Sequence, residues 1–173
     1  LDHVGAPLPP MTGRAQVEKV AVKGVRAGCT PTRMPILIAI AQGMGDHETV
    51  RREGWTCSNA GGLPTIVISG PIRKAIGINA GRNFLSAYTR AQPCIARAMA
   101  YMIMHISGAR MQQEDMSRPG SACRFGLCVA ADEEARPPSW PHLPPAPGPA
   151  GGDNALPPVS PSAHTHLPNL TAP

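Results

Sequence analysis

The chain contains few aromatic residues: Phe, Trp and Tyr together make up 3% of its 173 residues. Proteins that bind single-stranded nucleic acid stack bases on aromatic side chains, so this scarcity argues against such a role. Lys and Arg outnumber acidic residues by 16 to 11, but no basic block or recognised binding motif accompanies the excess. We therefore expect no nucleic-acid partner, and a core built from Ala, Val, Ile, Leu and Met.

Long apolar runs and a cysteine framework are also missing. No run approaches the roughly 18–20 apolar residues that a membrane helix needs, and no basic segment followed by an apolar stretch marks a secretory signal. A disulfide framework would favour an even number of cysteines in a secreted protein. The five cysteines are irregularly spaced, at Cys29, Cys57, Cys94, Cys123 and Cys128. We therefore expect reduced thiols, a cytoplasmic location and no membrane partner.

Composition changes abruptly after Arg136. Residues 137–173 hold 12 of the 21 prolines, no Lys or Arg, and one acidic residue, Asp153. Proline blocks helix interiors and central strands, so this region is predicted to be an extended or disordered tail. Residues 1–136 are predicted to form one α/β domain, whose 16 basic and 10 acidic residues give a charge of +6. The chain begins at Leu1, and a clipped or frameshifted product is one reading of its ends.

Hydrophobic periodicity predicts alternating helices and strands within residues 1–136. The run at 64–69 is short and β-branched, which is typical of a buried strand. Residues 46–62 are expected to form a loop with one strand near Trp55. The other predicted elements are helices at 12–27 (closed by Gly28), from 32 to about 43–45 and at 89–107, and a second strand at 125–130. Together they predict an α/β fold, a small mixed or parallel sheet with flanking helices.

One predicted helix carries a stripe of apolar residues at helical spacing: Met99, Met102, Ile103 and Ile106. Flexible methionine side chains at this spacing usually fill a protein core. We therefore expect the stripe to be buried rather than to hold a cofactor.

A glycine-spaced turn follows the first predicted strand. Gly77, Asn79 and Gly81 lie close in sequence to basic side chains, and exposed backbone amides at such a turn can bind an anion. The segment matches neither a Walker loop nor a dinucleotide fingerprint. It is therefore either a site for a small anionic molecule or a plain connection with exposed basic residues.

Cys29 lies at the junction between two predicted helices, in Gly28-Cys29-Thr30-Pro31. A cysteine at the start of a helix can have a lowered thiol pKa, because the peptide dipoles favour the thiolate. Cys29 is thus the best candidate for a nucleophile or redox group. The alternative is an inert, small hydrophobic residue beside an apolar helix.

Two further features are weaker. Asp132, Glu133 and Glu134 follow a predicted strand, where carboxylates can act as acid or base, although a run of acids is more often a solvated face. Cys123 and Cys128 form a single C-x4-C pair, whereas a structural zinc site needs four ligands. No metal and no cofactor are predicted.

Several short stretches resemble an uncharacterised bacterial family associated with small partner proteins that bear a U-G-S-C motif. The similarity covers roughly residues 17–141, and the stretches that carry it are Val17–Val22, Ala27–Pro31, Met34–Ala39, Ser69–Ile72, Gly77–Asn79, Ile95–Ala98, Ile106–Ala109, Cys128–Glu134 and Ser139–Pro141. The resemblance implies thiol or selenol redox chemistry, with this chain as the companion subunit of a U-G-S-C protein.

The leading hypothesis is a component of a thiol-dependent, redox-type bacterial enzyme that acts on a small anionic substrate. Cys29 would be the nucleophile, Gly77, Asn79, Gly81 and Arg97 would hold the anion, and Glu133 and Glu134 would be acid or base. Two alternatives remain open. The chain is either a non-catalytic binding or assembly subunit for a U-G-S-C partner, or a truncated copy without activity.

Overall fold

A computed structural model describes residues 2–8, 10–45, 63–86, 88–116, 126–132, 134–139 and 164–166. These residues form both helices and a parallel sheet, which confirms the predicted α/β class. The elements are α1 (Val17–Ala27), η1 (Pro31–Arg33), α2 (Met34–Gly45), β1 (Leu63–Ile68), α3 (Ile72–Ala75), α4 (Ala91–His105), β2 (Leu127–Ala130) and β3 (His164–His166).

The sheet is parallel, one of the two arrangements expected. β1 pairs with β2 from Thr65 opposite Leu127 to Ile68 opposite Ala130. The three-residue β3 pairs with β1 in parallel, so the strand order is β2-β1-β3. β1 and β2 confirm the strands predicted at 64–69 and 125–130, whereas β3 lies in the segment predicted to be an extended tail.

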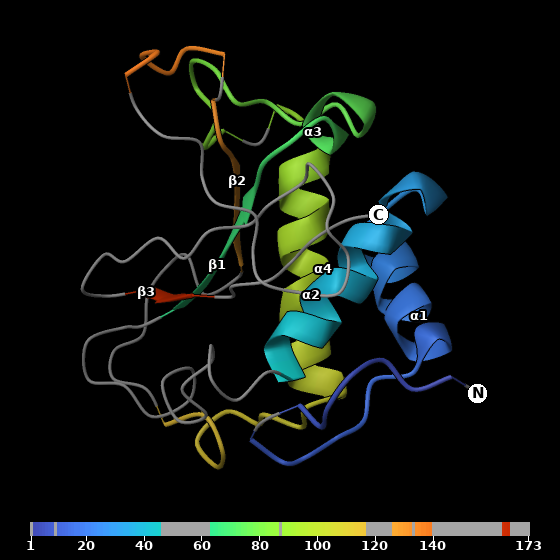
Figure 1. The fold of residues 1–173 in the computed structure, drawn as a ribbon. Helices are drawn as coiled ribbons and strands as arrows, with labels where there is room; N and C mark the ends of the chain where they lie inside the picture. Colours follow the sequence, from blue (N-terminus) through green and yellow to red (C-terminus); the bar gives the residue numbers. More distant parts are fainter. Residues whose placement is uncertain are drawn as a thin grey trace.

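The helices pack in layers against one side of β1 and β2 (Figure 1). α4 lies between these strands and α1, and α2 packs against both α1 and α4. Because β1 and β2 run in parallel, their carboxyl ends meet at one edge of the sheet, next to α3 and the first turn of α4 (Figure 1). This edge is where ligands generally bind in open α/β sheets.

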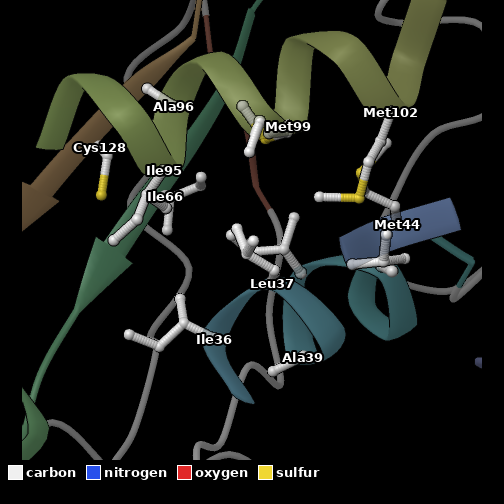
Figure 2. Packing of buried hydrophobic residues seen from close by; sticks show 14 of the residues in the cluster. Ile36, Leu37, Ala39, Met44, Ile66, Ile95, Ala96, Met99, Met102 and Cys128 are labelled. Carbon is white, nitrogen blue, oxygen red and sulfur yellow. The ribbon is translucent and has the colours of Figure 1, made fainter. Parts of the chain in front are cut away.

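The core is aliphatic and rich in methionine, as the scarcity of aromatic residues predicts (Figure 2). Met99 and Met102 on α4 are fully buried and lie beside Met44 of α2. Ile106 is buried and Ile103 is partly buried against the same cluster. The prediction that this stripe belongs to the core is therefore confirmed.

The first predicted helix begins later than expected, at Val17 rather than residue 12. The preceding segment folds back on itself: the Val4 amide donates to the Ala15 carbonyl at 2.9 Å, and the Leu8 amide to the Gly13 carbonyl at 2.8 Å. These hydrogen bonds hold residues 4–8 against residues 13–15, with Val4 and Leu8 buried in the core. They also use the carbonyl groups of Gly13 and Ala15, which a longer helix would need. The predicted loop and strand at 46–62 lie outside the described residues.

Candidate functional site

Cys29 lies between α1 and η1, at the junction that the sequence predicts. α1 ends at Gly28, which has a φ of 89°, and the Cys29 amide donates to the Gly24 carbonyl at 2.9 Å. Hydrogen bonds of this kind satisfy the last carbonyl groups of a helix. The Cys29 thiol is therefore fixed at the carboxyl end of α1, half-buried.

Two other thiols lie near Cys29. Cys94, in the first turn of α4, places its Sγ atom 3.3 Å from the position that a Cβ atom on Gly28 would occupy. Cys128, in β2, is buried and faces α4 beside Ile95 (Figure 2). All three cysteines are free thiols. Three separate elements thus bring together thiols that are 34 to 99 residues apart in the sequence.

Burial raises the pKa of the Cys29 thiol to about 11, with a further increase from Cys94. The guanidinium groups of Arg33 and Arg90 act in the opposite direction, and Arg33 also does so by hydrogen bonding. The expectation of a lowered pKa is therefore wrong, because the loss of solvent around the sulfur outweighs the favourable charges. Cys29 is protonated at neutral pH. Burial and the nearby Cys29 raise the pKa of Cys128 as well.

Arg33 is the charged residue near Cys29 that is best suited to bind a ligand. The residue is only 7% exposed. Its Nε and Nη1 atoms are buried and have no hydrogen-bond partner within the described parts of the chain. Arg90, at the start of α4, is exposed, and its Nη2 atom lies 3.8 Å from the position of a Cβ on Gly28. Cys29 therefore has one buried and one exposed arginine beside it.

The glycine turn uses its amides internally. The Gly77 amide donates to the Lys74 carbonyl at 3.2 Å, and the Gly81 amide donates to Asn79 Oδ1 at 3.0 Å. Asn79 Nδ2 donates in turn to the Arg82 carbonyl at 3.1 Å. These hydrogen bonds shape the turn and leave neither glycine amide free for a ligand. Anion binding by this turn stays a prediction that these contacts do not favour.

Gln92 attaches the glycine turn to the first turn of α4. Its buried Nε2 atom donates to the Asn79 carbonyl at 2.7 Å and to the Phe84 carbonyl at 3.2 Å. Cys94, two residues later, contacts Gly28. The amino end of α4 therefore brings the glycine turn into the neighbourhood of Cys29. Arg97 lies exposed on α4, about one turn beyond Cys94.

Glu134 is held in an ion pair. Arg73, which is buried, donates through Nη1 to Glu134 Oε2 at 3.0 Å and through Nη2 to Oε1 at 3.1 Å. Lys74 Nζ lies 3.0 Å from the same carboxylate. Hydrogen bonds from Arg73 and Lys74 lower the pKa of Glu134 to about 2, so it is ionised at neutral pH. This geometry favours a structural role over acid–base chemistry. Glu133 lies outside the described residues.

Sequence reasoning missed Cys94 and Arg33. The sequence does contain a signal for Cys94, because this cysteine follows Pro93 near the start of a predicted helix. Cys29 lies in a similar position, just before a predicted helix. Arg33 had none, since nothing in the surrounding sequence distinguishes a buried arginine from an exposed one.

Within the residues described, no group of three or more His, Cys, Asp or Glu side chains is arranged to hold a metal ion. None of the described helices has the length and hydropathy required to cross a bilayer. Comparison with protein-family models, with curated proteins and with solved structures finds no match. The chemistry of the site therefore rests on its own residues.

Proposed function

We propose that this chain is a thiol-dependent redox component in which Cys29 reacts with a small anionic disulfide and Cys94 completes the reaction. The observation that carries the proposal is the position of the Cys94 sulfur against Gly28, the residue before Cys29. Resolution of a mixed disulfide within one chain needs a second thiol close to the first, because that thiol attacks the protein sulfur of the mixed disulfide.

The exchange consists of two attacks. The Cys29 thiolate attacks one sulfur of the small disulfide, forms a mixed disulfide and releases one small thiolate. The Cys94 thiolate then attacks the Cys29 sulfur, forms a Cys29–Cys94 disulfide and releases the second small thiolate. Two protein thiols are oxidised, one small disulfide is reduced to two thiols, and the two protein protons pass to the leaving thiolates.

Neutral-pH reactivity would depend on a partner. Because its pKa is raised to about 11, Cys29 alone is a slow nucleophile at pH 7. The resemblance to the bacterial family implies a U-G-S-C protein whose own thiol or selenol would be the faster nucleophile. At neutral pH the partner's thiolate or selenolate would attack the small disulfide in place of Cys29 and release one small thiolate. Cys29 would then attack the small-molecule sulfur of this mixed species and release the partner, and Cys94 would resolve the mixed disulfide on Cys29 as at alkaline pH.

Oxidation by oxidised glutathione, which is an anionic disulfide, tests the exchange. We expect peptide mapping of the wild-type chain at pH 9 to recover a Cys29–Cys94 disulfide. In Cys94→Ser, glutathione should remain attached to Cys29, whereas Cys128→Ser should behave as the wild type. The proposal fails if Cys94→Ser does not accumulate the mixed disulfide, or if Cys29 pairs with Cys128 in the wild type.

A second candidate is the non-catalytic assembly subunit, which exposed apolar residues on α1 favour. Val17, Val22 and Val25 are 38%, 46% and 74% exposed on this helix. Native mass spectrometry with a U-G-S-C protein tests assembly. We expect a complex that the double substitution Val22→Glu and Val25→Glu abolishes. A complex that forms while glutathione exchange is absent would favour assembly over catalysis.

A further inference from the structure

Arg33 keeps a positive charge inside the protein without a carboxylate among the described residues to balance it. Arg33 is 7% exposed, and its Nε and Nη1 atoms have no acceptor in the parts of the chain that the structure describes. Buried charges are normally paired, because removing an ion from water is costly unless another charge and hydrogen bonds replace the solvent. Arg73 follows this rule through Glu134 and two backbone carbonyl groups.

The neighbouring Cys29 does not supply the missing charge. The thiol is protonated at neutral pH, because its pKa is raised to about 11. Among the described residues, the groups that act electrostatically on Cys29 are Cys94, Cys128, Arg33 and Arg90, and none of these is a carboxylate. Arg90, exposed beside Gly28, adds a second positive charge close to the half-buried sulfur. Two positive charges therefore lie near Cys29, and two donor atoms of the buried Arg33 guanidinium have no acceptor among the described residues.

We infer that Arg33 binds the anionic oxygens of a small carboxylate- or phosphate-bearing ligand beside Cys29, with Arg90 adding charge near Gly28. Nε has one N–H and Nη1 has two, so several acceptor oxygens on one group suit them. This assignment differs from the glycine turn, whose two glycine amides already have acceptors. Anion binding at Arg33 adds a binding residue to the proposed function. The identification of the anion as the redox substrate rests on that proposed function.

Anion binding is measured without any redox step, so its failure and the failure of thiol exchange are distinguishable. Thermal unfolding is followed at pH 7 and constant ionic strength while chloride is replaced by phosphate or by acetate. We expect one or both anions to raise the Tm of the wild type by about 3–6 °C at ten times Kd. Cys29→Ser should retain this shift. The more effective anion identifies the chemical group that the site takes.

Substitution locates the site. Arg33→Met should remove the shift, and without anion its Tm should equal or exceed that of the wild type, because an unpaired buried charge has been removed. Arg97→Gln, at the residue that the sequence suggests, and Arg26→Gln, on the exposed side of α1, should keep the full shift. The inference is overturned if Arg33→Met keeps the shift, if Arg97→Gln loses it, or if neither anion shifts the wild type.

A measurement on the wild type covers the case in which Arg33→Met does not fold. Arg33 stabilises the Cys29 thiolate, so an anion that occupies its guanidinium should slow Cys29 alkylation at pH 10. We expect at least a threefold decrease in rate at saturating anion, read at Cys29 by peptide mapping, with the alkylation rate of N-acetylcysteine in the same buffers as the reference. An unchanged Cys29 rate would exclude binding at Arg33.

Discussion

Arg33 and Arg73 are both almost fully buried, yet their surroundings differ. Arg73 donates to Glu134 and to the carbonyl groups of Gly70 and Ala131, and so joins the carboxyl ends of β1 and β2. Arg33 leaves Nε and Nη1 without acceptors among the described residues. The same residue type thus links the ends of two strands at one position, while at the other it has donor atoms without an acceptor in the segments that the structure describes.

The pKa of Cys29 predicts an alkaline reactivity profile. At pH 8 a thiol with a pKa of about 11 is ionised in roughly one molecule in a thousand. We expect the rate of Cys29 alkylation by iodoacetamide to rise about tenfold per pH unit from pH 8 to 10 and to level off above 11. Mass spectrometry of the Cys29 peptide measures this rate. A plateau near pH 9 would contradict the effect of burial.

The same pKa shift affects folding. The folded-state pKa is raised above the ordinary value of 9.0, so the protonated thiol is favoured in the native state. Its contribution to stability is complete below pH 9 and decreases as the pH rises towards 11. Cys29→Ser should show a weaker loss of stability over this range in urea titrations.

Glu134 predicts the opposite dependence at acid pH. Its pKa is lowered from 4.5 to about 2, so its contribution to stability is present above pH 4.5 and is lost as the pH falls towards 2. We expect Glu134→Gln to reduce the urea midpoint at pH 7 and to match the wild type near pH 2. Glu18→Gln is the control, because Glu18 is exposed on α1 and forms no ion pair with the described residues. An equal effect of the two substitutions at pH 7 would contradict a role in joining the strands.

At the scale of elements, α4 is the helix that contacts β2, α1 and α2. Its buried residues include Ile95, Met99 and Met102, and its amino end carries Cys94 and Gln92. One helix therefore supplies the centre of the core and also positions the thiol and the glycine turn. Mutations in its buried face should reduce stability, while mutations at its amino end should alter the site.

Met99 and Met104 form a matched pair on α4, with exposed fractions of 0% and 45%. Met99→Ala should lower the free energy of unfolding by about 2–5 kcal/mol, because it removes buried apolar atoms and leaves a cavity. Met104→Ala should change it by less than about 0.5 kcal/mol. Urea denaturation followed by circular dichroism measures both, and similar losses would show that the core is packed differently.

Gly126 tests how β2 approaches α4. Its φ is 102°, and a Cβ there would lie 2.3 Å from the Ala96 carbonyl oxygen. Gly77 also has a positive φ, of 66°, but a Cβ there would meet nothing within 4 Å. We expect Gly77→Ala to cost about 1–2 kcal/mol from backbone conformation alone, and Gly126→Ala to cost clearly more. Equal costs in urea titrations would contradict the close packing of β2 on α4.

For the whole molecule, the hydrophobic core cluster extends from Val4 to Cys128. Because the cluster lies within residues 1–136, we expect a chain ending at Arg136 to unfold cooperatively, with a urea m-value close to that of the full chain. Circular dichroism during urea and thermal unfolding checks this. A broad, non-cooperative transition would show that residues 137–173, which include β3, complete the fold.

Much of the fold could be predicted from the sequence because its signals are local. The β-branched run at 64–69 has the composition of a buried strand, and the spacing of Met99 and Met102 places both on one side of a helix. The predicted start of α1 was wrong by five residues, since the hydrogen bonds from Val4 to Ala15 and from Leu8 to Gly13 use carbonyl groups that a longer helix would need. The spacing of apolar residues does not show whether other hydrogen bonds use the backbone groups that a helix needs.

The sequence by itself determined the α/β class, the aliphatic core and the candidacy of Cys29 as a thiol at a helix junction. Only the tertiary structure decided that Cys94 lies against Gly28, that Glu134 is paired with Arg73, and that Arg33 is buried with two donor atoms that find no acceptor in the described segments. The physical reason is that a pKa, a thiol pair or an unpaired charge depends on which distant elements displace water around a group. That displacement depends on packing between segments far apart in the chain, which spacing along the sequence does not specify.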